Sequence, residues 1–260
     1  MNKKKKGHFL ELLLVISALF LGVLVVILVY RGRTETIITG PGEGTTGERN
    51  ISGSYPLPSE LVPSDITTYF AYTEIPDIIF NRIKGVSFTE DCPVSREELR
   101  YMTVLYWGPD GAAHKGELIV NRAIAQDVAE IFYELYKASY PIESVKLIDE
   151  YGGSDEVSMA KNNTSCFNAR KMTGAESWSL HAYGLAIDIN PLYNPYVGAD
   201  GTILPVSGEQ YADRNNSFLM KIDEQDYAYR MFARHGFTWG GSWSGLKDYQ
   251  HFEKKPGETE

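Results

Sequence analysis

The chain has 260 residues, of which 43% are hydrophobic and 23% are charged, and its formal net charge is −9. This length suits one good-sized domain with a tail and leaves little room for a second domain. Six of the 25 basic residues but only one of the 34 acidic residues lie in residues 1–33, so the rest of the chain carries a formal charge of −14. Such an acidic polypeptide is not expected to hold nucleic acid by nonspecific electrostatic attraction.

The first predicted element is a membrane anchor at residues 12–30. Residues 12–29 are apolar apart from Ser17 and Gly22, and a run of this length can cross a bilayer as a helix. A cleaved signal peptide is the alternative, but its apolar core would usually be shorter, and no small-x-small cleavage site follows the run. Four lysines precede the run and two arginines follow it, which predicts a cytoplasmic tail at residues 1–11. We therefore expect a single-pass protein of the cell membrane whose remainder is extracellular.

The next segments predict a tethered domain. Residues 31–66 are rich in Gly, Thr, Ser, Pro and Glu, which is typical of a flexible linker. The folded domain is predicted at residues 67–254, and residues 255–260 are predicted to be a disordered tail. The exported part holds two cysteines, Cys92 and Cys166. An extracellular location permits a disulfide between them, but two thiols do not imply one, so the sequence leaves this pairing open.

Hydrophobic periodicity predicts a small α+β domain with few strands, two main helices and long loops. Asp223 is the expected N-cap of the second helix and Gly236 its stop signal. A stretch rich in Gly, Ser and Asn, residues 151–165, is expected to be mostly loop. In chain order, strands are predicted at 100–107, 145–148, 185–190 and 249–253, and helices at 122–140 and 223–235.

Two of these strands carry a candidate metal site. In the strand at 185–190 the apolar residues alternate with Asp188, so that its carboxylate projects away from the core. His181 precedes this strand, and His251 lies on the last strand of the domain. Two imidazoles and one carboxylate are a ligand set that leaves zinc an open position for water. Asp248, three residues before His251, is a candidate general base for hydrolysis.

A lone histidine is more often an ordinary hydrogen-bonded residue than a metal ligand. The combination of both histidines with Asp188, Asp248 and the strand pattern favours the metal site here. The segments that carry these residues resemble those of a known family, the M15 peptidases. These are D-alanyl-D-alanine peptidases of the VanY and VanX types and endolysin-like L-alanyl-D-glutamate peptidases. The signature Ser-x-His-x-x-Gly-x-Ala-x-Asp is matched by Ser179, His181, Gly184, Ala186 and Asp188, and its carboxylate-x-x-His half by Asp248 and His251.

The resemblance implies a fold, a cofactor and roles for individual residues. The fold would be a hedgehog/DD-peptidase-like α+β domain, with a central antiparallel sheet and flanking helices, preceded by the transmembrane helix. One zinc ion would be bound by His181, Asp188 and His251. Asp248 would be the catalytic base, and Arg170 would help to hold the substrate and the developing oxyanion.

Further residues have expected supporting roles. Ser179 and Glu253 are expected to orient the ligands, and Tyr183, Trp239 and Trp243 are candidates for the substrate cleft. The expected substrates are peptidoglycan stem peptides. Aspartate at position 248 is more like the L-alanyl-D-glutamate branch of the family than the D-alanyl-D-alanine branch, which usually has glutamate there. The oligomeric state is not predicted.

Two other functions remain open at this stage. The metal set could belong to a non-catalytic zinc-binding extracellular module, and Cys166 as a fourth ligand would make such a site purely structural. Ser158 and Lys161 also fit the Ser-x-x-Lys motif of serine DD-peptidases. One match of this kind is about what chance gives, and no Ser-x-Asn or Lys-Thr-Gly partner accompanies it.

Overall fold

The computed structural model describes residues 66–172 and 175–257. The predicted cytoplasmic tail, the anchor at residues 12–30 and nearly all of the linker lie outside the described residues. Within the described ranges, no helix combines the length and the apolar character that a membrane crossing requires. The predictions for residues 1–65 therefore stay predictions.

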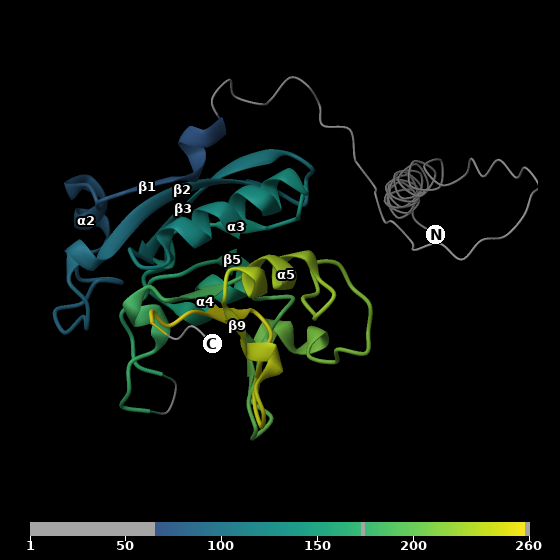
Figure 1. Cartoon of the computed structure of the whole chain (residues 1–260). Helices are drawn as coiled ribbons and strands as arrows, with labels where there is room; N and C mark the ends of the chain where they lie inside the picture. Colours follow the sequence, from purple (N-terminus) through teal and green to yellow (C-terminus); the bar gives the residue numbers. More distant parts are fainter. Residues whose placement is uncertain (1–65, 173–174, 258–260) are drawn as a thin grey trace, which may run out of the picture. The chain divides into compact units, whose positions relative to one another are not determined.

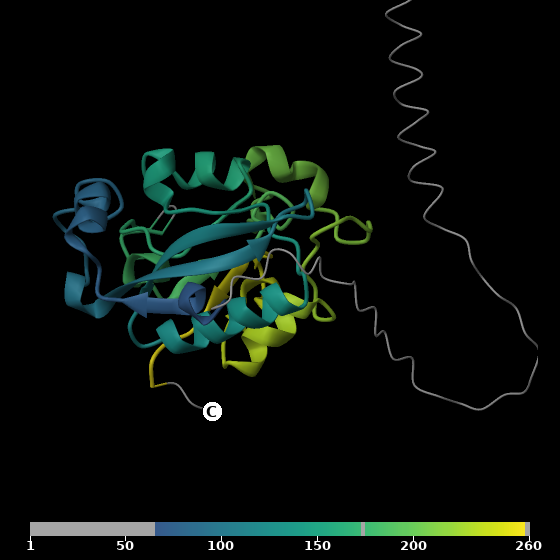
Figure 2. The same cartoon turned by 90° about the horizontal axis from the view of Figure 1, so that it is seen from above.

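The first half of the domain is built on a long β-hairpin (Figures 1 and 2). Strands β2 and β3 pair antiparallel along their full length, from Leu99 opposite Asn121 to Trp107 opposite Ala113, and β1 pairs antiparallel with β2. The strand predicted at 100–107 is confirmed, whereas β3 was not predicted. In order, with η for 3-10 helices, the elements are η1 (Ile66–Phe70), β1 (Ala71–Thr73), α2 (Asp77–Ile83), η2 (Arg96–Glu98), β2 (Leu99–Trp107), β3 (Ala113–Asn121) and α3 (Ala125–Lys137).

The hairpin separates two hydrophobic cores because successive side chains of a strand point to opposite faces. Val104 and Leu118 belong to the main core, which also contains the apolar stripe of α3. Leu99 and Ile119 belong to a smaller core, to which α2 contributes Ile83 among others. Helices therefore pack against both faces of this sheet.

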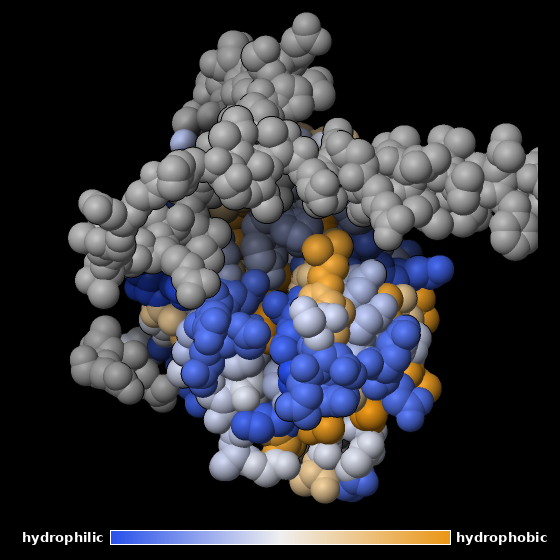
Figure 3. Space-filling model, turned by 90° about the vertical axis from the view of Figure 1, so that its right-hand side faces the viewer, coloured by the Kyte–Doolittle hydropathy of each residue, from blue (hydrophilic) through white to orange (hydrophobic). Residues whose placement is uncertain are grey.

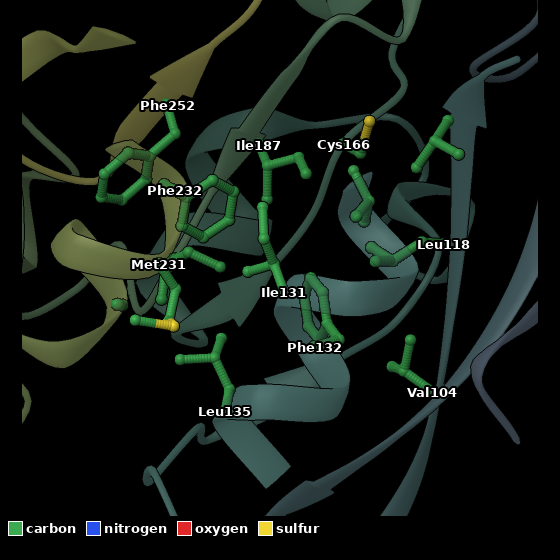
Figure 4. Close-up of a cluster of buried hydrophobic side chains, with 14 of the residues drawn as sticks. Val104, Leu118, Ile131, Phe132, Leu135, Cys166, Ile187, Met231, Phe232 and Phe252 are labelled. Atoms are coloured by element: carbon green, nitrogen blue, oxygen red, sulfur yellow. The ribbon is translucent and has the colours of Figure 1, made fainter. Parts of the chain in front are cut away.

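The main core joins the hairpin to the second half of the domain. Figure 4 shows Ile131 and Phe132 of α3 beside Ile187, Phe232 and Phe252. The rings of Phe232 and Phe252 stack with their centroids 4.2 Å apart. Both rings are fully buried, so the strand that ends the domain is fixed to the core through Phe252.

The second half consists of short strands and helices joined by loops. Its elements are β4 (Ser144–Val145), η3 (Ile148–Tyr151), α4 (Asp155–Ala160), β5 (Asn163–Thr164), η4 (Leu180–Tyr183), β6 (Ala186–Asp188), β7 (Tyr196–Val197), β8 (Ile203–Leu204), η5 (Val206–Tyr211), α5 (Tyr227–Arg234), β9 (Thr238–Trp239), η6 (Gly240–Ser242), β10 (Lys247–Asp248) and β11 (His251–Glu253). The sheets run β6-β11-β9 and β10-β7-β8, both antiparallel, and β4 pairs parallel with β5.

The predicted α+β class, with antiparallel sheets and helices, agrees with this arrangement. The single central sheet was wrong, because the described strands are divided among three small antiparallel sheets and one parallel pair. The predicted loop at 151–165 contains α4, whose first turn is capped when Ser154 Oγ accepts from Val157 N. The predicted strand at 145–148 is reduced to β4, and a 3-10 helix follows it.

Both main helices exist but are shorter than predicted. Helix α3 begins and ends three residues inside the predicted range of 122–140. Helix α5 begins after Asp226, whose side chain accepts from Ala228 N and Tyr229 N. Asp226 is therefore the N-cap, and the prediction of Asp223 was wrong. Gly236 follows the helix with a φ of 77°, as expected of a stop residue.

The two cysteines are free thiols in the structure. Cys166 is buried in the main core (Figure 4), whereas Cys92 is partly exposed beside the smaller core. A disulfide between them does not form. On the face drawn in Figure 3, hydrophilic side chains alternate with scattered hydrophobic ones.

Candidate metal centre

Strand pairing places two of the predicted ligands directly opposite each other. Strands β6 and β11 are antiparallel, and Asp188 is the register partner of His251. On its other side, the backbone of Asp188 exchanges two hydrogen bonds with Ser165. The main core holds Ile187 and Phe252, which are the next register pair. Because side chains alternate along both strands, a buried apolar pair on one face leaves Asp188 and His251 together on the other.

The third predicted ligand reaches the same place from η4. Ser179 caps this 3-10 helix, and its hydroxyl accepts from the backbone N–H of His181. Gly184 ends the helix with a φ of 65°. A Cβ at Gly184 would lie 2.8 Å from the backbone nitrogen of Asn121, so only glycine fits between η4 and the hairpin. The Gly-x-Ala-x-Asp spacing therefore brings the chain sharply from His181 into β6.

The three side chains converge at the spacing of metal ligands. His181 Nε2 lies 3.2 Å from His251 Nδ1 and 3.3 Å from Asp188 Oδ2, and His251 Nδ1 lies 3.1 Å from Asp188 Oδ1. Metal–ligand bonds of about 2.0 Å in a tetrahedral zinc site would separate the ligand atoms by about 3.3 Å. Among the described residues, no fourth His, Cys, Asp or Glu joins this buried group.

The remaining ring nitrogens fix which tautomer each histidine adopts. His181 Nδ1 lies 2.5 Å from the carbonyl oxygen of Cys166, which can only accept, so Nδ1 carries the proton. His251 Nε2 likewise donates to Glu253 Oε2 at 3.0 Å. In both rings the nitrogen that faces the centre is therefore the one that can bind a metal ion or a second proton. This is the arrangement in which a protein orients metal-binding histidines.

The buried ligand atoms create an electrostatic environment that favours a positive charge at the centre. Burial alone would lower the pKa of His251, but its hydrogen bonds with Asp188 and Glu253 outweigh burial and raise the pKa to about 10. Burial would raise the pKa of Asp188, but the charges and hydrogen bonds of His181 and His251 hold it well below its usual range. A proton or a metal ion satisfies this set of lone pairs. Two imidazole nitrogens and a carboxylate, with both outer N–H groups already occupied, fit zinc.

Asp248 lies on the neighbouring small sheet, where it pairs with Tyr196 of β7. Its Oδ1 is buried and has no hydrogen-bond partner among the described residues. Burial raises the pKa of Asp248 to about 6, with His251 opposing and Asp188 adding to the shift. Because those two ligands act on its charge, the carboxylate lies within electrostatic range of the metal centre. An unpaired buried oxygen here is available to a water molecule or to a substrate.

The backbone around Asp248 depends on a glycine that sequence reasoning missed. A Cβ on Gly240 would lie 2.6 Å from the carbonyl oxygen of Asp248 and 2.8 Å from its Cβ. Only glycine therefore lets η6 pack against β10 at this point. The Gly-Gly pair at 240–241 was a visible signal, since close backbone approach is a common reason for glycine outside turns.

Arg170 lies beside the centre but already has a partner. Its Nε forms an ion pair with Asp155 Oδ2, and its Nη1 donates to the carbonyl oxygen of Lys171 at 3.2 Å. Burial lowers the pKa of Arg170, while the charges of Asp188 and Asp248 raise it. The guanidinium is thus electrostatically linked to one metal ligand and to the candidate base. Asp155 was not singled out from the sequence, because nothing in the local pattern marks it.

The other predicted residues divide into two groups. Ser179 and Glu253 each contact a ligand residue, as described above, and Trp243 lies with its ring centroid 5.3 Å from that of His251. Tyr183 is partly buried and packs against both hydrophobic cores. Trp239 is a core residue, with its indole N–H donating to Tyr249 O. Cleft roles for Trp239 and Tyr183 stay predictions.

The surroundings of Cys166 and Ser158 do not fit the roles that the two alternative functions would give these residues. Cys166 contributes its carbonyl oxygen to His181, and its thiol contacts Gly184 O at 3.6 Å, outside the ligand group. Ser158 is buried in α4 and accepts a hydrogen bond from Asn163 Nδ2, whereas Lys161 is exposed. A serine nucleophile needs an accessible hydroxyl next to its base. Ser158 does not meet that requirement.

Comparison with known proteins agrees with the geometry. A family model described as D-alanyl-D-alanine carboxypeptidase, of the M15 peptidases, matches residues 173–254. This segment contains His181, Asp188, Asp248 and His251. Over this segment the chain is similar to the M15 peptidases. Searches of curated proteins and of solved structures gave no match. Arg170 and Asp155 lie before the matched segment, so the M15 match itself does not cover them.

Proposed function

We propose that this chain is a zinc enzyme of the M15 type that hydrolyses peptide bonds in peptidoglycan stem peptides. The observation that carries the proposal is the convergence of His181, Asp188 and His251 at tetrahedral spacing, with both outer N–H groups of the imidazoles engaged. A nearby carboxylate with an unpaired buried oxygen, Asp248, supports catalysis in addition to metal binding.

The residues of the centre divide the work of hydrolysis. His181, Asp188 and His251 would hold the ion. When bound, zinc supplies Lewis acidity, which makes water a stronger acid and a peptide carbonyl a better electrophile. Asp248 takes a proton from the attacking water onto its carboxylate and later delivers this proton to the nitrogen of the departing amine. A carboxylate with a pKa near 6 is suited to both steps near neutral pH.

Arg170 would act on charge that develops during the reaction. Its side chain is about one-third exposed, and its guanidinium is under the influence of Asp188 and Asp248. A fixed positive charge beside the centre stabilises the oxyanion of the tetrahedral intermediate or binds a carboxylate of the substrate. We assign Arg170 this role on its position and charge.

The proposal extends to location and substrate. The apolar run at residues 12–30 would anchor the enzyme in the cell membrane with the peptidase domain outside, where peptidoglycan lies. The family description names D-alanyl-D-alanine carboxypeptidases, whereas the aspartate at position 248 favours cleavage between L-alanine and D-glutamate. These two bonds give different products, so one digestion distinguishes them.

The test is digestion of a purified muropeptide mixture by the full-length protein in detergent, with products identified by mass spectrometry. We expect either loss of a terminal alanine or separation of the stem after its first alanine. A chelator should abolish the activity and added zinc restore it, while a β-lactam should have no effect. The His251→Ala variant should lose both zinc, measured by elemental analysis, and activity. Zinc-loaded protein that hydrolyses no stem peptide would support the non-catalytic module instead.

A further inference from the structure

We propose that Asp155, at the start of α4, is a positioning residue for Arg170. In this view Asp155 holds the Nε edge of the guanidinium and leaves the Nη2 end available to the substrate. The inference rests on the proposed function. It adds a residue from outside the segment that matches the family model.

The ion pair joins two otherwise distant parts of the chain. Asp155 is the first residue of α4, and Ser154 caps this helix. Its Oδ2 forms an ion pair with Arg170 Nε, a buried atom that makes no hydrogen bond among the described residues, and its Oδ1 accepts from Asn168 Nδ2 at 2.9 Å. Each carboxylate oxygen therefore has its own partner, which prevents Asp155 from turning away from Arg170.

Asn168 connects this pair to the metal centre. The side chain is 5% exposed, and its Nδ2 also donates to Gly153 O at 3.2 Å. Its backbone N–H donates to the carbonyl oxygen of His181, and the carbonyl of Arg170 accepts from Ser179 N, each at 3.1 Å. The segment that carries Arg170 thus runs alongside the segment that carries His181. A displacement of Asp155 would be transmitted to a side chain beside the centre.

The contacts of Arg170 leave part of the guanidinium unused. Nε is occupied by Asp155, and Nη1 donates to Lys171 O. No residue in the described ranges accepts a hydrogen bond from Nη2. A guanidinium is planar, so fixing its Nε edge also fixes the direction of the free Nη2. Asp155 therefore determines where the available donor points, although it contacts neither the ligands nor the candidate base.

The test compares Asp155→Asn with Glu156→Gln in the full-length protein. Both variants remove one negative charge from the first turn of α4, but Glu156 contacts Val206 N instead of Arg170. We expect Asp155→Asn to lower kcat on stem peptides about 10- to 100-fold, because misplaced groups cost activity on this scale. Zinc content should be unchanged, and Glu156→Gln should behave like wild type.

A double variant separates positioning from a general structural effect. In an Arg170→Gln background, Asp155→Asn should change kcat less than about twofold, because the side chain that it positions is gone. A readout that does not need activity is the exchange of the Arg170 Nε–H proton with solvent, followed by NMR. This exchange should accelerate in Asp155→Asn and stay unchanged in Glu156→Gln.

The outcomes distinguish this inference from the proposed function. If wild type is active and Asp155→Asn is equally active, the inference alone is overturned. It is also overturned if Asp155→Asn lowers kcat as strongly in the Arg170→Gln background as it does in wild type. A zinc-loaded wild type that cleaves nothing would overturn the proposed function. In that case the proton exchange decides: an unchanged rate in Asp155→Asn would also overturn the positioning of Arg170.

Discussion

Two aspartates of this domain have similarly raised pKa values but differ in the hydrogen bonds that their carboxyl groups accept. Burial raises the pKa of both Asp226, at the start of α5, and Asp248, on β10, to about 6. Asp226 Oδ1 accepts from the hydroxyl of Tyr140 at 3.1 Å and from the backbone N–H groups of Ala228 and Tyr229. The whole arrangement is a helix cap in which fixed donors satisfy Oδ1 of the carboxyl group.

Asp248 lacks such a closed set of donors. One of its oxygens is buried without a partner among the described residues, and its charge interacts with His251 and Asp188. A raised pKa alone therefore does not mark a functional site. The distinguishing features are an unsatisfied polar atom and nearby ligands, since structural carboxylates are expected to have their hydrogen bonds made.

The largest expected difference between the two aspartates is in catalysis. Asp248→Asn should lower kcat about 10³-fold, because the amide cannot accept the proton of the attacking water. Zinc content should be preserved, since His181, Asp188 and His251 remain. Muropeptide hydrolysis and elemental analysis of the same preparation measure both quantities.

Asp226→Asn is the matched control for this experiment. Asparagine is also a good N-cap and can accept from the same donors. The variant should hydrolyse stem peptides like wild type. A comparable loss of activity in both variants would contradict the distinction between a structural and a catalytic aspartate.

The pH dependence of stability should differ in a predictable direction between wild type and Asp226→Asn. An unfolded aspartate has a pKa near 3.9, whereas Asp226 titrates near 6 in the folded protein. Between these values the folded state holds a proton that the unfolded state has released. This group therefore stabilises the fold fully below about pH 4, and its contribution is lost as the pH rises through about 6.

The size of this effect is on the order of 2–3 kcal/mol, because each pKa unit corresponds to about 1.4 kcal/mol. Asparagine cannot ionise, so Asp226→Asn should become more stable relative to wild type between pH 4 and pH 7. Urea unfolding of both proteins across this range measures the difference. A stability difference that is constant with pH would show that Asp226 titrates normally.

A smaller effect is expected on zinc affinity when the hydrogen-bond partner of a histidine ligand is changed. Glu253→Gln weakens the acceptor of the His251 Nε2 proton, so we expect zinc affinity to fall about 10- to 100-fold. Competition with a fluorescent chelator measures the affinity. Glu134→Gln, which affects only a surface pair with Lys137 on α3, should leave it unchanged. Equal affinities in all three proteins would mean that Glu253 does not orient His251.

Sequence reasoning found residues whose spacing is set by local geometry. His181 and Asp188 are separated by one 3-10 turn, one glycine in a left-handed conformation and a three-residue strand. The alternation around His251 is equally local. These patterns follow from strand periodicity and from glycine chemistry, both of which can be read from a single chain.

Contacts between distant segments were not predictable in the same way. Nothing near Asp155 indicates that it meets Arg170, and nothing near Cys166 indicates that its carbonyl receives the His181 proton. Element boundaries failed for a related reason. Both Asp223 and Asp226 are suitable N-caps in the sequence, and the buried contact of Asp226 with Tyr140 on the main core distinguishes them.

The smallest expected effect concerns that same contact. Tyr140→Phe removes the hydroxyl that donates to Asp226 and should cost about 1–2 kcal/mol of unfolding free energy at pH 7. The cost should be smaller at pH 4, where the carboxyl is protonated and the hydrogen bond loses its charge assistance. Loss of this donor should also move the titration of Asp226 to still higher pH. Tyr133→Phe, on the preceding helix α3, is the control and should stay within about 0.5 kcal/mol of wild type. A cost that is equal at both pH values would mean that the Tyr140 hydroxyl does not sense the charge of Asp226.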